Sequence, residues 1–447
     1  MKISLSTIKI LQTGFEKEIK SNEWLEKLKS GDFYNFELDL HKWIMKIYDK
    51  ICGAIVMLFS RSQEFEKIQR KIAKSQGLRK LEERQAELQL RTGTKISYPS
   101  LYAKSVPKGY EGSRHLSHLH WNIIQKSGLM YQSLMCLFSV ICPSFMLSKR
   151  LLNYQGIHAN FDRIRNLSLS LAERCKDHRT KIQLKDGETL AGKRVLIAID
   201  GGRTRMRLYK DENSKGRSNK YETPWQEPKL FVITTIDEKG KASKEELPIY
   251  DCCFGDDETF EILEAYLKEL DIEKAKDVQF VADGALWIWA RVKPMLMGLG
   301  VKEEKITETL DYYHAVEHLH QVKEYLEKDQ QESLFPKLKQ ALWQGDIKEL
   351  KHLIRKGIPG VDIKEFKPYN YFYKNCNRID YQRFMNEKRP CGSGVIESGI
   401  RRIINLRFKC PSTFWYPENV EKLILMRSIA LSGRWEIMIK NISKIGS

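Results

Sequence analysis

The chain has 447 residues, and 42% of them are hydrophobic, which is enough to build sizeable cores and excludes an intrinsically disordered protein. Its formal net charge is +18, and this excess favours a polyanionic partner, with nucleic acid ahead of an anionic membrane surface. The nine cysteines include no Cys-x-x-Cys pair, so neither a zinc ribbon nor a thioredoxin-type site is indicated. Without a disulfide framework or a secretory signal, the sequence predicts a cytoplasmic protein.

The first part of the chain is predicted to be mainly helical. Hydrophobic spacing predicts a long helix over 33–60, and a charged helical segment is predicted over 62–90. Glycines and prolines over 91–115 predict a linker or a small strand module. The uncharged stretch 129–147 is nearly long enough to span a bilayer, but its polar residues and Pro143 favour a buried helix that ends near this proline, with no membrane contact.

Two short helical stretches, 144–153 and 160–175, are joined by a turn that contains Gly156, which is the outline of a helix-turn-helix. Any helical hairpin gives this outline, so the assignment depends on the basic charge of the chain. We therefore divide this part into a helical region with a linker, 1–115, and a helical DNA-binding region, 116–185. The predicted DNA contacts of the second helix are Asn160, Arg163 and Arg165.

From residue 190 the pattern becomes that of an α/β domain. Strands are predicted at 194–200, 206–209, 230–237, 278–283 and 305–311, with helices at 257–270 and 285–297. The predicted order is three strands, a helix, a strand, a helix and a strand. This is the order of the ribonuclease-H fold, which needs one more helix. That helix is predicted at 394–408. The fold class is therefore a ribonuclease-H-like core, 190–314 and 386–447, with a helical insertion over 315–385.

Three acidic residues are the candidate site. Asp200 and Asp283 end strands that are neighbours in this fold, and Glu397 on the last helix can join them. Singly, each has a simpler explanation, because Asp-Gly is a common turn and Glu397 can pair with Arg401 one helical turn later. Together they favour a site of hard oxygen ligands that holds two Mg²⁺ or Mn²⁺ ions about 4 Å apart.

Four sequence motifs follow one another in the second half of the chain: ADGA followed by WIW within 282–289, DYYH through EHL within 311–319, GSGVIES at 392–398 and LSGRW at 431–435. They resemble motifs of the DDE transposases of bacterial insertion sequences, with the Kra and Lre types of the Mutator-like group as the nearest likeness. The resemblance spans about 190–440 and is faint before residue 120. It implies that Asp200, Asp283 and Glu397 are the catalytic, metal-binding residues. It also implies recognition of terminal inverted repeats in double-stranded DNA, strand cleavage and strand transfer by a homodimer or higher oligomer associated with the nucleoid.

The same resemblance gives Asp311 and His314 a supporting role near the cleaved phosphate, although Asp311 could simply cap the next helix and His314 could be a core residue. Basic residues beside Glu397 are expected if phosphates pass through the site, but a solvated basic face would look the same. The predicted DNA contacts of this segment are Ser393, Arg401, Arg402, Arg407 and Lys409.

Two other functions fit parts of the sequence. Residues 314–318 read H-x-x-E-H, the signature of inverted zinc peptidases, for which Glu397 could be the third ligand, but that assignment leaves the aspartates and the charge unexplained. A catalytically inactive, DNA-binding relative of transposases has the same sequence features. For stacking on a DNA base, the candidates are Trp287, Trp289, Trp343, Trp415 and Tyr312.

Overall fold

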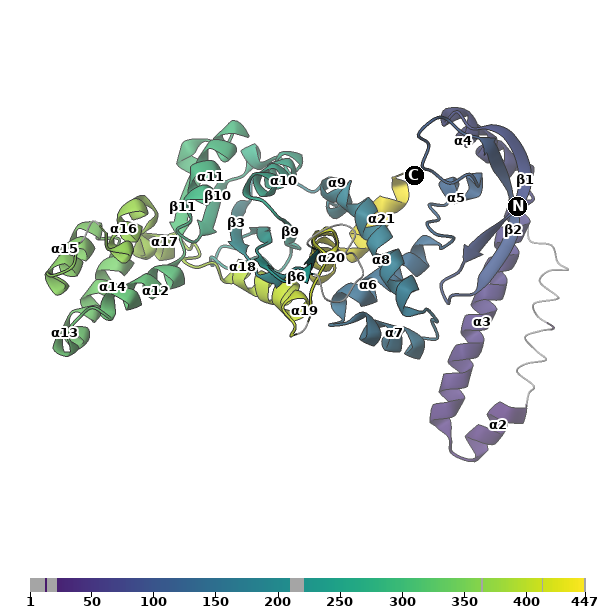
Figure 1. Cartoon of the computed structure of the whole chain (residues 1–447), viewed down its shortest axis with the longest axis horizontal. Coiled ribbons are helices and arrows are strands. Elements are labelled where there is room, and N and C mark those ends of the chain that lie inside the picture. The colour runs from purple at the N-terminus through teal and green to yellow at the C-terminus, as the bar shows by residue number, and fades with distance from the viewer. Residues whose placement is uncertain (1–12, 14–21, 210–220, 363–364, 412, 446–447) are drawn as a thin grey trace. The chain divides into compact units, whose positions relative to one another are not determined.

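The computed structural model describes residue 13 and residues 22–209, 221–362, 365–411 and 413–445 (Figure 1). The chain folds as two units, and each is described by itself. The N-terminal unit comprises described residues of 1–131 and 149–159, and the second unit comprises described residues of 132–148 and 160–445. This division differs from the predicted boundaries near 115 and 185. None of the described helices combines the length and hydrophobicity needed to cross a bilayer.

The N-terminal unit is built on the long helix α3, Phe33–Ser60, which confirms the helix predicted there. Helices α2 (Asn22–Lys29), α4 (Gln63–Ser75) and α5 (Leu116–His120) and the antiparallel strands β1 (Arg79–Gln89) and β2 (Lys95–Ser105) accompany it. The prediction of helix over 62–90 is therefore wrong after residue 75. Gly77 has a φ of +67°, a left-handed conformation that ends the helix, and the charged residues that follow form the exposed face of a strand.

Helix α6, Leu129–Ile141, ends two residues before Pro143, as predicted. Helices α7 (Phe145–Tyr154) and α8 (Phe161–Lys176) form the two arms of the predicted helix-turn-helix, and Gly156 in the turn has a φ of +68°. Residues 149–159 belong to the N-terminal unit and residue 160 onward to the second unit. The helix-turn-helix is thus not contained in either unit.

The second unit is a mixed α/β structure around one five-stranded sheet. Its strands, in the order β11-β10-β3-β8-β9, are Ile306–Leu310, Asp277–Ala282, Arg194–Gly201, Lys229–Thr235 and Ile249–Cys253. Strands β3, β10 and β11 are parallel, whereas β8 and β9 run antiparallel to their neighbours. Helices α10 (Asp256–Glu269) and α11 (Leu286–Gly298) pack with the sheet in one hydrophobic core.

One strand of this sheet was predicted wrongly. Residues 206–209 lie outside the sheet, in the short pairs β4 (Thr204–Arg205) with β7 (Trp225–Gln226) and β5 (Leu208–Tyr209) with β6 (Tyr221–Glu222). The third strand of the meander is β9, whose apolar run is interrupted by the fully buried Asp251. Arg179 of α9 (Arg179–Gln183), at 3.5 Å, and the Tyr266 hydroxyl, at 2.9 Å, compensate this carboxylate.

After β11 the chain leaves the sheet as a set of helices with its own hydrophobic core. They are α12 (Tyr312–Lys323), α13 (Lys328–Ser333), α14 (Phe335–Gln344), α15 (Ile347–Gly357), α16 (Lys367–Lys374) and α17 (Tyr381–Asn386), and we call them the insertion. Its two ends are joined, because the Tyr312 amide donates to the Cys391 carbonyl at 3.0 Å. The insertion therefore begins and ends at the same edge of the sheet.

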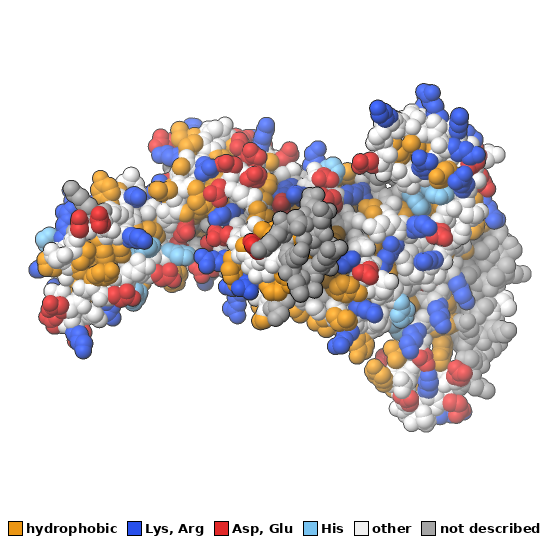
Figure 2. All heavy atoms as spheres, in the orientation of Figure 1, with side chains coloured by type: hydrophobic (Ala, Val, Ile, Leu, Met, Phe, Trp, Pro, Cys, Tyr) orange, Lys and Arg blue, Asp and Glu red, His pale blue; other side chains and the backbone are white. Residues whose placement is uncertain are grey.

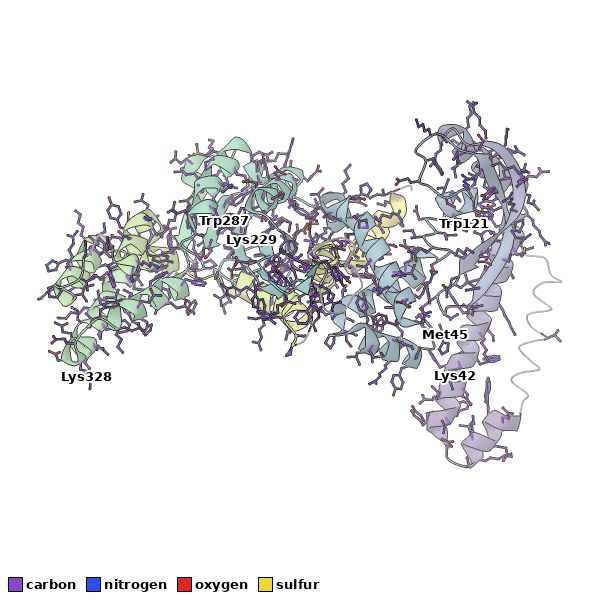
Figure 3. All side chains as sticks on the ribbon, viewed as in Figure 1. Lys42, Met45, Trp121, Lys229, Trp287 and Lys328 are labelled. Atoms are coloured by element: carbon purple, nitrogen blue, oxygen red, sulfur yellow. The ribbon has the colours of Figure 1, made fainter. Side chains whose placement is uncertain are left out.

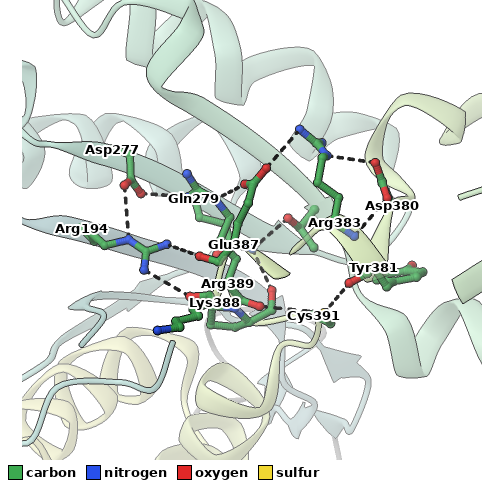
Figure 4. A network of polar contacts seen from close by, with 12 residues as sticks. Arg194, Asp277, Gln279, Asp380, Tyr381, Arg383, Glu387, Lys388, Arg389 and Cys391 are labelled. Atoms are coloured by element: carbon green, nitrogen blue, oxygen red, sulfur yellow. Dashed lines mark hydrogen bonds and ion pairs between the residues drawn. The ribbon is translucent and has the colours of Figure 1, made fainter. Parts of the chain in front are cut away.

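A polar network fixes the chain where it returns from the insertion (Figure 4). Asp277 of β10 accepts from Arg389 at 2.8 Å and from Arg194 of β3 at 3.3 Å. Arg194 also donates to the carbonyls of Glu387 and Lys388, at 3.1 and 3.2 Å. The returning segment is thereby held across β3 and β10 before it enters the last helices.

The last helices complete the second unit. Helix α18, Gly394–Gly399, continues as a π-helical turn over Ile400–Asn405 and as α19, Leu406–Phe408, in agreement with the helix predicted over 394–408. Helices α20 (Pro417–Leu431) and α21 (Trp435–Lys444) follow. Between them, the buried Arg434 of the LSGRW motif binds Glu188 at 2.7 Å and donates to backbone carbonyls, including those of Gln183 and Pro248. This arginine is a structural residue.

Candidate acidic site

The register of the three parallel strands places an acidic residue at the same level of each. Ala198 pairs with Val281, and Ala282 pairs with Leu310. Continuing this register to the carboxyl ends of the strands puts Asp200, Asp283 and Asp311 in one row. Neighbouring strands lie about 4.8 Å apart, so the row brings three carboxylates to one edge of the sheet. The Asp311 amide donates to the Ala282 carbonyl at 2.8 Å, which extends the pairing to the row itself.

Local turns hold the first two aspartates. The Asp200 carboxylate accepts from the Gly201 amide at 2.7 Å, and the Asp283 carboxylate accepts from the Ala285 amide at 3.0 Å. A glycine at position 284 leaves room for the ring of Tyr371 from the insertion, which a β-carbon there would overlap unless the ring moved. The turn after Asp283 is therefore packed directly against helix α16. Nothing in the sequence near Tyr371 indicated this contact.

Asp311 links the row to the helix that carries Glu397. Its carboxylate caps α12 by accepting from the His314 amide at 2.8 Å, and it also accepts from the Ser393 amide. The Ser393 hydroxyl donates to Glu397 at 3.0 Å and does not cap α18. One ligand atom each of Asp311, His314 and Glu397 lies within 4.8 Å of the other two, which is the spacing of a candidate cation site.

The structure thus groups the predicted residues differently from the sequence analysis. From the sequence, Asp200, Asp283 and Glu397 are the expected ligands, and Asp311 and His314 have a supporting role. In the structure, Glu397 lies with Asp311 and His314, and Asp283 stands between Asp311 and Asp200 in the row.

Electrostatic interactions connect the members of this site. Burial, with a contribution from the charge of Asp283, raises the pKa of Asp200 to about 6. A hydrogen bond to Asp311, together with the negative charges of Asp311, Glu317 and Asp200, raises the pKa of His314 to about 9. Burial alone would raise the pKa of Asp311, but hydrogen bonds from His314 and Ser393 hold it below its usual value. At neutral pH the site therefore contains an imidazolium among carboxylates.

Lys229 and Glu227 are site neighbours that the sequence analysis missed. Lys229 pairs with Gly201 in the sheet, lies 2.7 Å from the Glu227 carboxylate and sits over the ring of Trp287 at 4.9 Å (Figure 3). The negative charge of Glu227 contributes to the raised pKa of Asp200. Lys229 therefore adds a positive charge close to the start of the acidic row.

The predicted DNA contacts differ in accessibility. Arg401, Arg402 and Lys409 are exposed. Arg407, by contrast, is 4% exposed and donates to the carbonyls of Pro143 and Ser139, so its guanidinium is occupied within the protein, and contact of this residue with DNA stays a prediction. Burial, together with the charge of Arg427, lowers the pKa of Arg407 to about 10.

In the predicted recognition helix, the Asn160 side chain caps α8 by accepting from the Arg163 amide at 2.8 Å, and Arg165 pairs with Asp162 at 3.1 Å. The oxygen of Asn160 is thus already bonded within the helix, whereas the Arg165 pair is exposed and can exchange partners. Reading of DNA by these residues stays a prediction.

The zinc-peptidase alternative gains no support from the geometry. His314 faces Asp311, and the His318 ring stacks on Tyr371 with 3.7 Å between the ring centres. Burial lowers the pKa of His318. Within the part of the chain that the structure describes, the group with metal-ligand spacing contains Asp311, His314 and Glu397 and leaves His318 out.

Comparisons with known proteins give a distant likeness to solved structures. No family model matches the sequence, and no curated protein matches it. A solved structure, the Drosophila P element transposase strand transfer complex, matches at 14% identity over 71% of this chain and 81% of that chain, with a TM-score of 0.25. This likeness is too low to carry an argument about function.

Proposed function

We propose that the chain is a DDE-type DNA transposase with a ribonuclease-H-like core. The row of Asp200, Asp283 and Asp311 on three adjacent parallel strands, with Glu397 beside Asp311, carries this proposal. Turn chemistry explains an aspartate after one strand. It does not explain three aspartates in register with a fourth acid next to them, and this arrangement favours a shared cationic ligand.

The donor set fits a hard divalent cation, because the ligands are carboxylates; the ring of His314 faces the Asp311 carboxylate and is not counted as a ligand. Asp200, Asp283 and Glu397, joined by Asp311, would hold the ions. When bound, two Mg²⁺ or Mn²⁺ ions would activate the attacking oxygen and stabilise the leaving oxygen of a phosphodiester. In this proposal Asp311 is a ligand, in addition to capping α12.

The remaining residues of the site have separate tasks in this proposal. His314 carries a positive charge at neutral pH and reduces the repulsion among the carboxylates when no cation is bound. Arg401, Arg402 and Lys409 are exposed on or just after the helix of Glu397, where they can hold the phosphates of the DNA. Lysines and arginines are spread widely over the visible face of the molecule, which suits a long polyanion (Figure 2).

The sequence motifs extend the proposal to the bacterial insertion-sequence transposases of the Kra and Lre types. In that case the chain binds the terminal inverted repeats of its element as a homodimer or higher oligomer, on the DNA of the nucleoid. The zinc-peptidase alternative is not pursued, because its second histidine stacks on Tyr371 and lies outside the candidate cation site.

The test is a cleavage assay with the full chain, Mg²⁺ and DNA that carries the sequences flanking its own gene. We expect cleavage at the element ends and joining to target DNA. Asp200→Asn, Asp283→Asn, Asp311→Asn and Glu397→Gln should each lower the rate by at least about a thousandfold, because each removes charge from the metal site without removing bulk. DNA binding, measured in the same preparations, should be nearly unchanged.

Matched controls are Asp329→Asn and Glu264→Gln, which change exposed acids away from the row and should keep full activity. An active Asp311→Asn variant would return this residue to a supporting role. DNA binding without cleavage by the unaltered chain would instead indicate an inactive relative of transposases.

A further inference from the structure

Between β3 and β8 the chain leaves the sheet as a narrow two-stranded extension that begins four residues after Asp200. In it Arg205 pairs with Trp225, and Tyr209 pairs with Tyr221. The proposed catalytic chemistry does not use this extension. Its side chains nevertheless form an ordered set of aromatic rings and guanidinium groups.

The extension is fixed to the segment that follows the helix of Glu397. The Trp415 amide donates to the Arg205 carbonyl at 3.1 Å, and the Arg207 amide donates to the Trp415 carbonyl at 2.7 Å. Closer to the site, a β-carbon on Gly202 would lie 2.6 Å from Ile404 of the π-helical turn. The two elements that carry Asp200 and Glu397 therefore continue side by side into the extension.

Two arginines each lie over two aromatic rings. The guanidinium of Arg205 lies 5.1 Å from the ring centre of Trp225 and 6.0 Å from that of Phe414. The guanidinium of Arg207 lies 4.5 Å from the ring centre of Tyr221 and 5.8 Å from that of Tyr416. We call this set the aromatic platform: Arg205, Arg207, Tyr221, Trp225, Phe414 and Tyr416.

The aromatic platform offers chemistry that the protein itself leaves unused. All nine tryptophans are described, and Trp225, at 48% exposure, is the most exposed of them. Trp289 and Trp415, two of the predicted stacking candidates, are 6% and 8% exposed. Within the described residues neither Arg205 nor Arg207 forms an ion pair. Arg207 hydrogen-bonds to the hydroxyls of Tyr416 and Tyr209, so its positive charge is held in place without a carboxylate to neutralise it. An exposed aromatic ring next to such guanidinium groups suits a ligand that has both a flat ring and negative charge.

We propose that the aromatic platform binds the DNA strand next to the cleaved phosphate: Trp225 stacks on an unpaired base, and Arg205 and Arg207 contact the adjoining phosphates. The inference deepens the proposed transposase function and depends on it for the position of the cut. A base inside a duplex has no free face, so the ligand is single-stranded DNA or a frayed DNA end. The aromatic platform then fixes the strand as it leaves the acidic row.

The stacking is tested by binding, which needs no cleavage. The probes are a short duplex with a single-stranded overhang, the same duplex with abasic overhang sites, and a blunt duplex, all measured by anisotropy with the full-length Asp283→Asn chain. Trp225→Ala should weaken binding of the overhang duplex about 5- to 150-fold, the range for one base on one ring, and Trp225→Phe should retain most of the affinity. With the abasic or blunt duplex, Trp225→Ala should cause little loss.

Equal losses on all three probes would overturn the stacking proposal, because the tryptophan would then be a structural residue. The phosphate contacts have a separate test, in which Arg205 and Arg207 are both replaced by Gln. The slope of log affinity against log salt concentration should become shallower by about 0.7–0.9 for each lost contact, which is about 1.4–1.8 for the two. An unchanged slope would overturn that assignment. If the chain binds overhangs in this way but never cuts DNA, the aromatic platform stands and the proposed transposase activity fails.

Discussion

The two units of the molecule differ in how they bury apolar surface. In the second unit the five-stranded sheet and helices α10 and α11 share one continuous core. In the N-terminal unit the cores are small, and α3 leaves Ile44 51% and Ile55 46% exposed. The carboxylates of the acidic row repel one another, so they need a rigidly packed framework to stay close together. The continuous core of the second unit provides this framework. We therefore expect substitutions in the second unit to have large effects and substitutions along α3 to have small ones.

The largest effect is expected at Arg434. Arg434→Met removes the partner of Glu188 and leaves backbone carbonyls without a donor, so it should lower the free energy of unfolding of the second unit by about 3–5 kcal/mol. Denaturant unfolding measures this loss. The control is Arg383→Met, which breaks an exposed ion pair with Asp380 and should cost about 0–1 kcal/mol.

The same ion pair has a pH signature. Burial alone would raise the pKa of Glu188, but Arg434 holds it below the usual value. The ion pair therefore stabilises the fold fully at pH values above the pKa of Glu188 in the unfolded chain, about 4.5. This stabilisation is lost as the pH falls through the lower pKa that Glu188 has in the folded protein. In the Arg434→Met variant, the fall in unfolding free energy that comes from protonating Glu188 at low pH should be absent.

A moderate effect is expected at Gly284. Gly284→Ala forces the ring of Tyr371 to move, so it should cost about 1–3 kcal/mol and displace the turn that holds Asp283. Cleavage should therefore fall even where the variant is fully folded. Gly298→Ala is the matched control, because a β-carbon there meets open space at the end of α11. Equal stability and activity of the two variants would contradict the packing argument.

The smallest effect is expected on α3. Ile55→Gln should change the unfolding free energy by less than about 0.5 kcal/mol, because this side chain is already largely in solvent. A loss of several kcal/mol in thermal or chemical unfolding would show that a partner covers this face of α3. It would also remove the contrast between the two units.

Asp200 and Asp283 could be predicted from the sequence because each follows a buried, apolar strand. The place of Asp311 in the row could not, because its strand reads ITETL, is half-buried and gives no apolar run. Strand β9 could not, since Asp251 interrupts its run and its partner Arg179 lies 72 positions earlier. Strand β1 was predicted as helix because its charged residues are typical of a solvated helix. The burial of Arg407 depends on carbonyls more than 260 residues away in the chain, and no local pattern reports such a contact.

The insertion starts and ends at one point. The Ser393 amide donates to Asp311, and the Tyr312 amide donates to the Cys391 carbonyl, so about 80 residues depart from and return to neighbouring positions. The entropic cost of closing a loop grows only with the logarithm of its length. The excursion can therefore lengthen, shorten or be exchanged over evolutionary time while the acids stay in register. Tyr371 against Gly284 is the contact that a replacement would have to recreate, so the insertion is tied to the acidic row at its base and free to change in length beyond it.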